Sequence, residues 1–151
     1  MVNVMLNKKS TANLETAKFC LEKKDRNFYS VGASRAYYAI FQAAKFFLEK
    51  NSFDYELFKK NEPRARRQRD YAHGSIKIAL AYFLQSNGFN NQEDLIFIKK
   101  MYSIFNRLYN LRLKGDYKED VINKKDLKQA IKSAELFINE LKKYDNQVVN
   151  V

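Results

Sequence analysis

Residues that interrupt helices or crosslink chains are scarce in this sequence of 151 residues, which holds one proline, four glycines and one cysteine. So few prolines and glycines exclude a loop-rich or all-β fold, because turns between strands depend on both. The single cysteine, Cys20, cannot form an internal disulfide, and we interpret it as a small core residue of a protein in the reducing cytoplasm.

Ligands for a metal are scarce too, since the chain has one histidine and one cysteine. This composition excludes the common Cys/His zinc clusters, and no Glu-x-x-His pair of the kind that binds metals in helical bundles is present. The four glycines stand alone, so there is no Gly-rich phosphate loop. We therefore expect no metal and no cofactor.

Long apolar runs are absent as well. No window approaches the roughly 18 apolar residues of a membrane span, and residues 1–10 hold no apolar stretch typical of a signal peptide. We expect a protein without membrane contact, located in the cytoplasm.

Positive charge is abundant: the net charge is +11, from 28 Lys and Arg against 17 Asp and Glu. Such an excess lies on the surface and attracts polyanions, nucleic acids first among them, because neutralised phosphates release counterions. Four arginines gather within residues 64–69: Arg64, Arg66, Arg67 and Arg69. No aromatic side chain accompanies them before Tyr71, which favours contact with a nucleic-acid backbone over base reading. A solvated loop is the alternative.

Apolar residues recur with a helical period through most of the chain. The predicted helices cover, approximately, residues 10–24, 28–50, 73–86, 92–117 and 124–143. Two of them begin with a signal of the capping-box type, Asn91 with Asp94 and Asn123 with Asp126. The tail from Asp145 is expected to fray.

Four long helices with short or modest connections predict an all-α fold, an antiparallel up-down helical bundle with short helical segments added. At this length we expect one domain over residues 1–151, with its core at about 10–143. Residues 51–70, which contain the only proline, are predicted to form a mobile basic loop with a short helical turn at 54–60.

Arg112 continues the apolar stripe of the predicted helix 92–117, following Tyr109 at helical spacing. A guanidinium there needs partners, because an unpaired buried charge is costly. Asp116 lies one turn further, so one interpretation is an Arg112–Asp116 pair that fixes the end of the helix. The other is that Arg112 faces a cleft and holds a phosphate.

His73 is the only side chain whose ordinary pKa lies near neutrality. It stands at the start of a predicted helix, where the dipole favours the neutral imidazole. It is either a capping or packing residue, or a general acid or base near a phosphodiester. Tyr37 and Tyr38 are adjacent on a helix, so we expect one to pack and the other to reach a cleft or a partner surface. Arg35 lies on the flank of that helix, within reach of an acidic residue or a phosphate.

Two segments resemble the HEPN family of prokaryotic defence and toxin–antitoxin systems. Residues 35–44, Arg-Ala-Tyr-Tyr-Ala-Ile-Phe-Gln-Ala-Ala, resemble the pattern R-x-Y-Y-A-x-F-x-A-A of the second helix of small HEPN proteins. Residues 112–117, Arg-Leu-Lys-Gly-Asp-Tyr, are similar to R-x-x-A-D-Y of the branch often encoded beside a minimal nucleotidyltransferase, with Gly115 in place of alanine. His73-Gly74 also fits that branch, and the order of these elements covers residues 10–143.

The resemblance implies a metal-independent, usually dimeric ribonuclease, in which an arginine is followed after four to six residues by a histidine. Arg112 matches the arginine, which would stabilise phosphate charge. Asp116 and Tyr117 stand where the histidine is expected. In a bundle, His73 can enter the same groove from another helix.

Three functions agree with these features. The first is a HEPN protein of a toxin–antitoxin or defence module that acts on RNA. The second is a non-catalytic HEPN module that binds nucleic acid, nucleotide or a nucleotidyltransferase partner. The third is a helical adaptor whose basic face binds an acidic protein. We expect RNA, a second copy of the chain and a nucleotidyltransferase or antitoxin as partners.

Overall fold

The computed structural model describes residues 7–117 and 122–149, and no strand occurs in either range. This confirms the all-α prediction. The helices are α1 (Lys8–Leu21), α2 (Arg26–Lys50), α3 (Tyr55–Asn61), the 3-10 helix η1 (Pro63–Ala65), α4 (His73–Ser86), α5 (Gln92–Tyr117) and α6 (Lys124–Val149).

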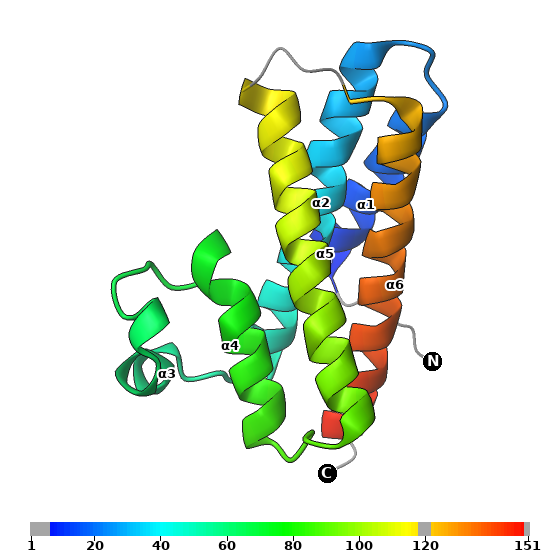
Figure 1. Ribbon diagram of the computed structural model, residues 1–151. Helices are drawn as coiled ribbons and strands as arrows, with labels where there is room; N and C mark the ends of the chain where they lie inside the picture. Colours follow the sequence, from blue (N-terminus) through cyan, green and yellow to red (C-terminus); the bar gives the residue numbers. More distant parts are fainter. Residues whose placement is uncertain (1–6, 118–121, 150–151) are drawn as a thin grey trace.

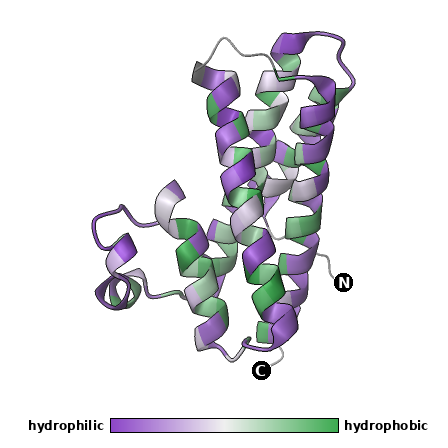
Figure 2. Cartoon of the chain, in the orientation of Figure 1, coloured by the Kyte–Doolittle hydropathy of each residue, from purple (hydrophilic) through white to green (hydrophobic). Residues whose placement is uncertain are grey.

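Four long helices, α1, α2, α5 and α6, run up, down, up and down to form an antiparallel bundle (Figure 1). The segment with α3, η1 and α4 is inserted between α2 and α5 and stands to one side of the bundle. Helix α4 is hydrophobic along much of its length (Figure 2), because it packs on α2, α3, α5 and η1. We call α3, η1 and the residues up to 72 the side lobe.

Helix α2 is the centre of the fold, since it contacts α1, α4, α5 and α6. Small side chains let these helices approach closely. The buried small residues of α2 are Gly32, Ala33, Ala36, Ala39, Ala43 and Ala44.

Both predicted capping boxes are confirmed. The backbone N–H of Asp94 donates to Asn91 Oδ1 at 2.9 Å, and the N–H of Asn91 donates back to Asp94 Oδ2 at 3.2 Å. Asn123 and Asp126 exchange the same two bonds at 2.8 and 3.4 Å. Each pair satisfies backbone donors that a helix start leaves without partners.

The predicted ends of two helices are wrong. Helix α1 begins at Lys8, because the Asn7 side chain accepts from the N–H of Lys9 at 2.7 Å and caps the helix earlier than expected. Helix α6 continues to Val149 and does not fray from Asp145. Asp145 is buried and accepts from Lys50 Nζ at 2.7 Å, so a tertiary contact holds the last turns of α6.

Residues 51–70 are only partly the loop that the sequence predicts. The helical turn expected at 54–60 is confirmed as α3, and η1 follows it. Tyr55, Phe58 and Ala65 are buried, so apolar contacts anchor this segment. Among the described helices, none is both long enough and apolar enough to cross a membrane.

Gly32 of α2 packs closely against Leu127 of α6 and Cys20 of α1. A methyl group there would lie 2.8 and 2.9 Å from the δ-carbons of Leu127 and 3.0 Å from Cys20 Cβ. Gly32→Ala should therefore destabilise the protein by about 1–3 kcal/mol through overpacking, although alanine favours helix by about 1 kcal/mol. Urea unfolding measures the change.

The double variant Gly32→Ala/Leu127→Ala provides the control. If overpacking is the cause, removing the Leu127 δ-carbons should relieve it, and the two changes should cost less together than the sum of their separate effects. A Gly32→Ala protein more stable than the parent would contradict the close approach.

Candidate functional site

Three helices bring His73 into contact with aromatic side chains distant in the sequence. His73, the first residue of α4, shares a hydrogen bond of 2.5 Å between its Nδ1 and the hydroxyl of Tyr37 on α2. Its ring stacks on Tyr109 of α5, with 3.4 Å between the ring centroids and 15° between the planes. The site therefore forms where α4 meets α2 and α5.

Arg112 lies one turn beyond Tyr109 on α5. Its guanidinium carbon lies 5.0 Å from the Tyr38 ring centroid and 5.6 Å from that of Tyr37, which are cation–π distances. We call Tyr37, Tyr38, His73, Tyr109 and Arg112 the His73 cluster.

The Arg112–Asp116 pair predicted from the sequence is present. Arg112 Nε lies 3.3 Å from Asp116 Oδ2. The orientation does not make a hydrogen bond, and the buried Nε has no other hydrogen-bond partner. The ion pair thus leaves donors of this half-buried guanidinium available, and both interpretations of Arg112 agree with the geometry.

Burial and neighbouring cations keep the His73 imidazole neutral at pH 7. Burial is the main cause, and the charges of Lys77 and Arg112 add to it; together they lower the pKa of His73 to about 4. Burial also raises the pKa of the Tyr37 phenol. A neutral imidazole has one donor and one acceptor nitrogen, so His73 and Tyr37 form a neutral hydrogen-bonded pair.

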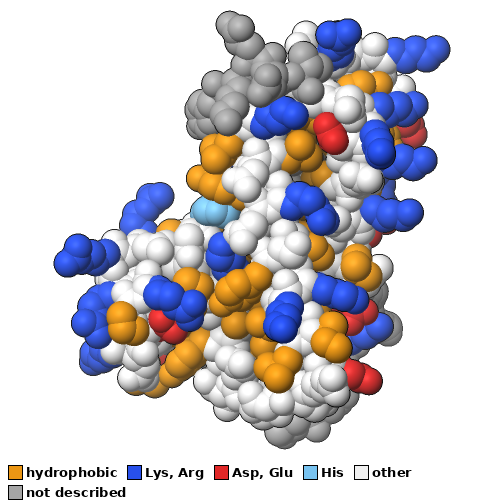
Figure 3. Space-filling model, in the orientation of Figure 1, with side chains coloured by type: hydrophobic (Ala, Val, Ile, Leu, Met, Phe, Trp, Pro, Cys, Tyr) orange, Lys and Arg blue, Asp and Glu red, His pale blue; other side chains and the backbone are white. Residues whose placement is uncertain are grey.

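The cluster is open to solvent on one side. Figure 3 shows the histidine at the surface, in the corner between the side lobe and the bundle. Tyr37 is buried, whereas Tyr38, Tyr109 and Arg112 are only partly covered. One of the two adjacent tyrosines, Tyr37, therefore packs in the core as expected, and a cleft or partner surface at Tyr38 stays a prediction.

The four arginines of the basic segment are exposed on the side lobe, and they differ in whether a neighbouring group already pairs with them. Arg64 forms a two-point pair with Glu62, with Nε–Oε1 at 2.8 Å and Nη2–Oε2 at 3.1 Å. Arg66 donates to the backbone oxygen of Lys60 at 3.2 Å. Arg66, Arg67 and Arg69 form no ion pair with a carboxylate of the described residues.

Two of the predicted residues stand apart from the cluster. Arg35 is exposed on the side of α2 that faces α1, where its Nη1 lies 3.4 Å from Asn13 Oδ1. The side chain of Tyr117 lies outside the described part of the chain.

Two residues at or beside the cluster, Tyr109 and Lys77, were not predicted from the sequence as site residues. Tyr109 stands three residues before Arg112, and Lys77 stands four residues after His73. Residues at these spacings are neighbours on a helix, so this spacing was the signal that could have identified both. Lys77 is half-buried, and burial lowers its pKa. Its Nζ donates to Asn106 Oδ1 on α5.

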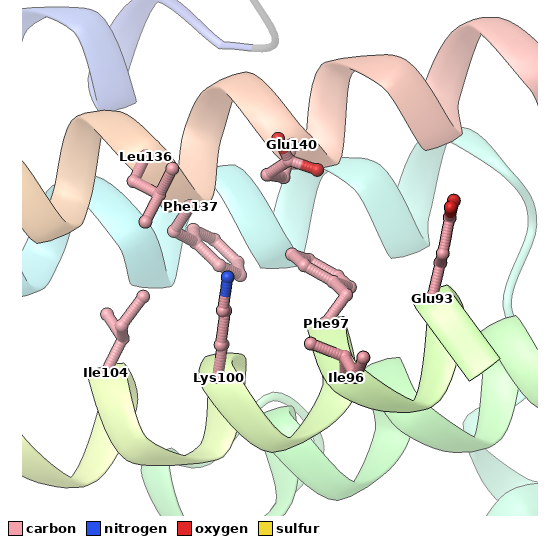
Figure 4. A pocket seen from close by; sticks show the side chains of 8 residues that line it. All are labelled: Glu93, Ile96, Phe97, Lys100, Ile104, Leu136, Phe137 and Glu140. Carbon is pink, nitrogen blue, oxygen red and sulfur yellow. The ribbon is translucent and has the colours of Figure 1, made fainter.

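A concavity lies between α5 and α6, away from the His73 cluster (Figure 4). It shares no residue with the His73 cluster, and its lining mixes apolar side chains with both charges. The lining residues are Glu93, Ile96, Phe97, Lys100, Ile104, Leu136, Phe137 and Glu140. Over residues 7–117 and 122–149, no three His, Cys, Asp or Glu side chains gather as a metal would require.

The fold and the site define a small helical-bundle protein with a basic side lobe and a histidine–tyrosine–arginine cluster. No protein-family model and no solved structure matches the chain. A protein of Methanocaldococcus jannaschii, named "Putative toxin MJ0605", is 32% identical over 132 residues, a match that covers 87% of this chain and 79% of that protein. The chain belongs to the same family as this archaeal protein.

The pKa of His73 makes the stability of the protein sensitive to mild acid. The unfolded chain binds a proton near pH 6.5, but the folded chain binds it only near pH 4. Because the folded state binds the proton less readily, the neutral His73 ring stabilises the folded protein. This stabilisation is complete above pH 6.5 and is lost as the pH falls toward 4. At pH 5 the expected loss is on the order of 1 kcal/mol, with allowance for the partial exposure of the ring.

Urea unfolding at pH 7, 6 and 5 measures this loss, and His73→Gln is the matched control because it removes the only histidine. The variant should lose less stability over this range than the parent. Parallel losses in both proteins would show that His73 titrates normally.

Proposed function

We propose that the chain is a toxin of the HEPN type that acts on RNA through the His73 cluster. The observation that carries the proposal is the meeting of His73, Tyr37 and Arg112 from three helices at one solvent-facing corner. The relationship to the archaeal protein named as a toxin supports the class. The choice of RNA as the substrate and of a metal-independent reaction is inferred from the resemblance to HEPN proteins.

The chemistry would be transfer of a phosphodiester to the neighbouring ribose hydroxyl. In the tautomer in which His73 donates from Nδ1 to the Tyr37 oxygen, Nε2 is free to accept the proton of a 2′-hydroxyl. The 2′-oxygen then attacks phosphorus, the bond to the 5′-oxygen breaks, and that oxygen takes a proton from water. The products are a 2′,3′-cyclic phosphate and a 5′-hydroxyl. Arg112, oriented by Asp116, would hold the charge that develops on the phosphate oxygens.

The side lobe would hold the rest of the RNA strand. Arg66, Arg67 and Arg69 are exposed and carry no carboxylate partner among the described residues, and the chain leads from them directly to His73. Contacts from such residues to phosphates position a strand without reading its sequence.

A non-catalytic module that binds RNA or a nucleotide is the second candidate. One observation favours it: a pKa of about 4 makes His73 a weak base at pH 7, whereas an efficient general base titrates near the working pH. The homodimer and the nucleotidyltransferase or antitoxin partner stay predictions.

RNA cleavage in the presence of EDTA tests the reaction. The parent should produce 2′,3′-cyclic phosphate ends, and His73→Gln and Arg112→Gln should each lower the rate by about 100-fold or more. Arg107→Gln is the matched control, because it removes an exposed arginine of α5 that bonds to Ser133 on α6 and is not part of the cluster. Binding without cleavage by the folded parent would favour the non-catalytic candidate.

The salt dependence of RNA binding tests the side lobe. Replacing Arg66, Arg67 and Arg69 with glutamine should reduce the slope of log K against log salt by about 2, since each contact with a single strand contributes about 0.7. Arg64 is left intact because Glu62 already pairs with it.

The matched control removes three exposed lysines from the start of α6: Lys124, Lys125 and Lys128. It lowers the net charge by the same amount. Equal slopes for the two triple variants would assign the effect to net charge and contradict a role for the side lobe.

A further inference from the structure

Two cations from different helices lie near the imidazole of His73, and Lys77 is one turn further along the same helix. Lys77 comes from α4 and Arg112 from α5, and both charges act on the ring. The other groups against it are the phenols of Tyr37 and Tyr109. No carboxylate of the described residues acts on the ring strongly enough to offset these cations.

Lys77 carries a positive charge that is partly removed from solvent. It is half-buried, and burial lowers its pKa. Its Nζ donates to the neutral amide of Asn106 and lies 5.8 Å from the Tyr102 ring centroid. No carboxylate of the described residues pairs with it, so no anion offsets the partial burial of this cation.

Arg112 is also incompletely satisfied. Its one carboxylate partner, Asp116, lies 3.3 Å from Nε without a hydrogen bond. A guanidinium has five N–H donors. Lys77, Arg112 and Asp116 together leave one positive charge beside a neutral ring that is open to solvent.

We propose that Lys77, Arg112 and His73 bind one phosphate group together, and that His73 takes up a proton as the phosphate binds. The inference rests on the proposed function, because RNA would be the source of the phosphate. It assigns Lys77 a binding role and makes occupation of the site dependent on pH. The charged ring belongs to the complex at low pH. At pH 7 a rise of about one unit from a pKa of about 4 leaves most of the imidazole neutral, so Nε2 can still accept the 2′-hydroxyl proton.

The proton uptake follows from charge. A phosphate between Lys77 and Arg112 offsets the two charges that disfavour the imidazolium and adds an attraction of its own. The charged ring then donates from both nitrogens, from Nδ1 to the Tyr37 oxygen and from Nε2 to the phosphate. Because linkage is reciprocal, a ligand that raises the pKa of His73 must bind more tightly as the pH falls.

The single histidine permits a direct test, since its ring signals in an NMR spectrum of labelled protein need no assignment. The ring is titrated from about pH 3.5 to 8 alone, with inorganic phosphate, and with a short single-stranded 2′-O-methyl RNA that lacks terminal phosphates and cannot be cleaved through a 2′-hydroxyl. The midpoint, near 4 in the free protein, should rise by about one unit or more with a bound ligand. A rise with RNA identifies a backbone phosphate as the ligand, and a rise with inorganic phosphate alone identifies a free or terminal one.

Variants of Lys77 separate binding from structure. Lys77→Met should raise the midpoint in the free protein, weaken phosphate binding about tenfold and remove the rise caused by ligand. Lys77→Arg should restore binding. Lys100→Met is the control, because it removes an exposed lysine of α5 that lines the concavity between α5 and α6.

An unchanged midpoint with both ligands would overturn the inference, and a full rise in folded Lys77→Met would overturn the role of Lys77. These outcomes can be distinguished from a failure of the proposed function. RNA cleavage without a change in the midpoint of the His73 titration would support the ribonuclease and contradict the proton-linked phosphate site. A change in midpoint without cleavage would do the reverse.

Discussion

The close packing of α2 among four other helices is the constraint on which the rest of the structure depends. Its small residues let α1 and α6 approach on some faces, and its tyrosines face α4 and α5 on another. Tyr37 is thereby buried with its hydroxyl directed at the one histidine. The helix that builds the core thus also provides the floor of the candidate site, so the chemistry of the cluster and the stability of the bundle share residues.

The inserted segment between α2 and α5 gives the bundle its asymmetry. A plain four-helix bundle would leave Tyr109 and Arg112 on the surface of α5. Helix α4 covers Tyr109 from one side, because its first residue, His73, stacks on that ring. The same segment carries the exposed arginines, so the positive surface and the histidine arrive together as one structural unit.

Local rules predicted most of the fold because they depend on residues near one another in the chain. The capping boxes, the short turn at 54–60 and the Arg112–Asp116 pair are all local, and the structure contains each of them. The contacts that escaped prediction join distant residues. Tyr37 and His73 are 36 positions apart, and Lys50 and Asp145 are 95 apart. No periodicity shows that a polar side chain near the end of a helix will be buried by another helix.

Asp94 links the beginning of α5 to the last part of α6. One of its oxygens accepts from the N–H of Asn91, and the other accepts from the Tyr144 hydroxyl at 2.6 Å. Together with the Lys50–Asp145 bond, this contact closes one end of the bundle with residues made late in synthesis. A growing chain can form the pairing of α1 with α2 early. It cannot complete the core until residue 145 has left the ribosome, so the partly made protein exposes apolar surface of α2 and α5 for seconds.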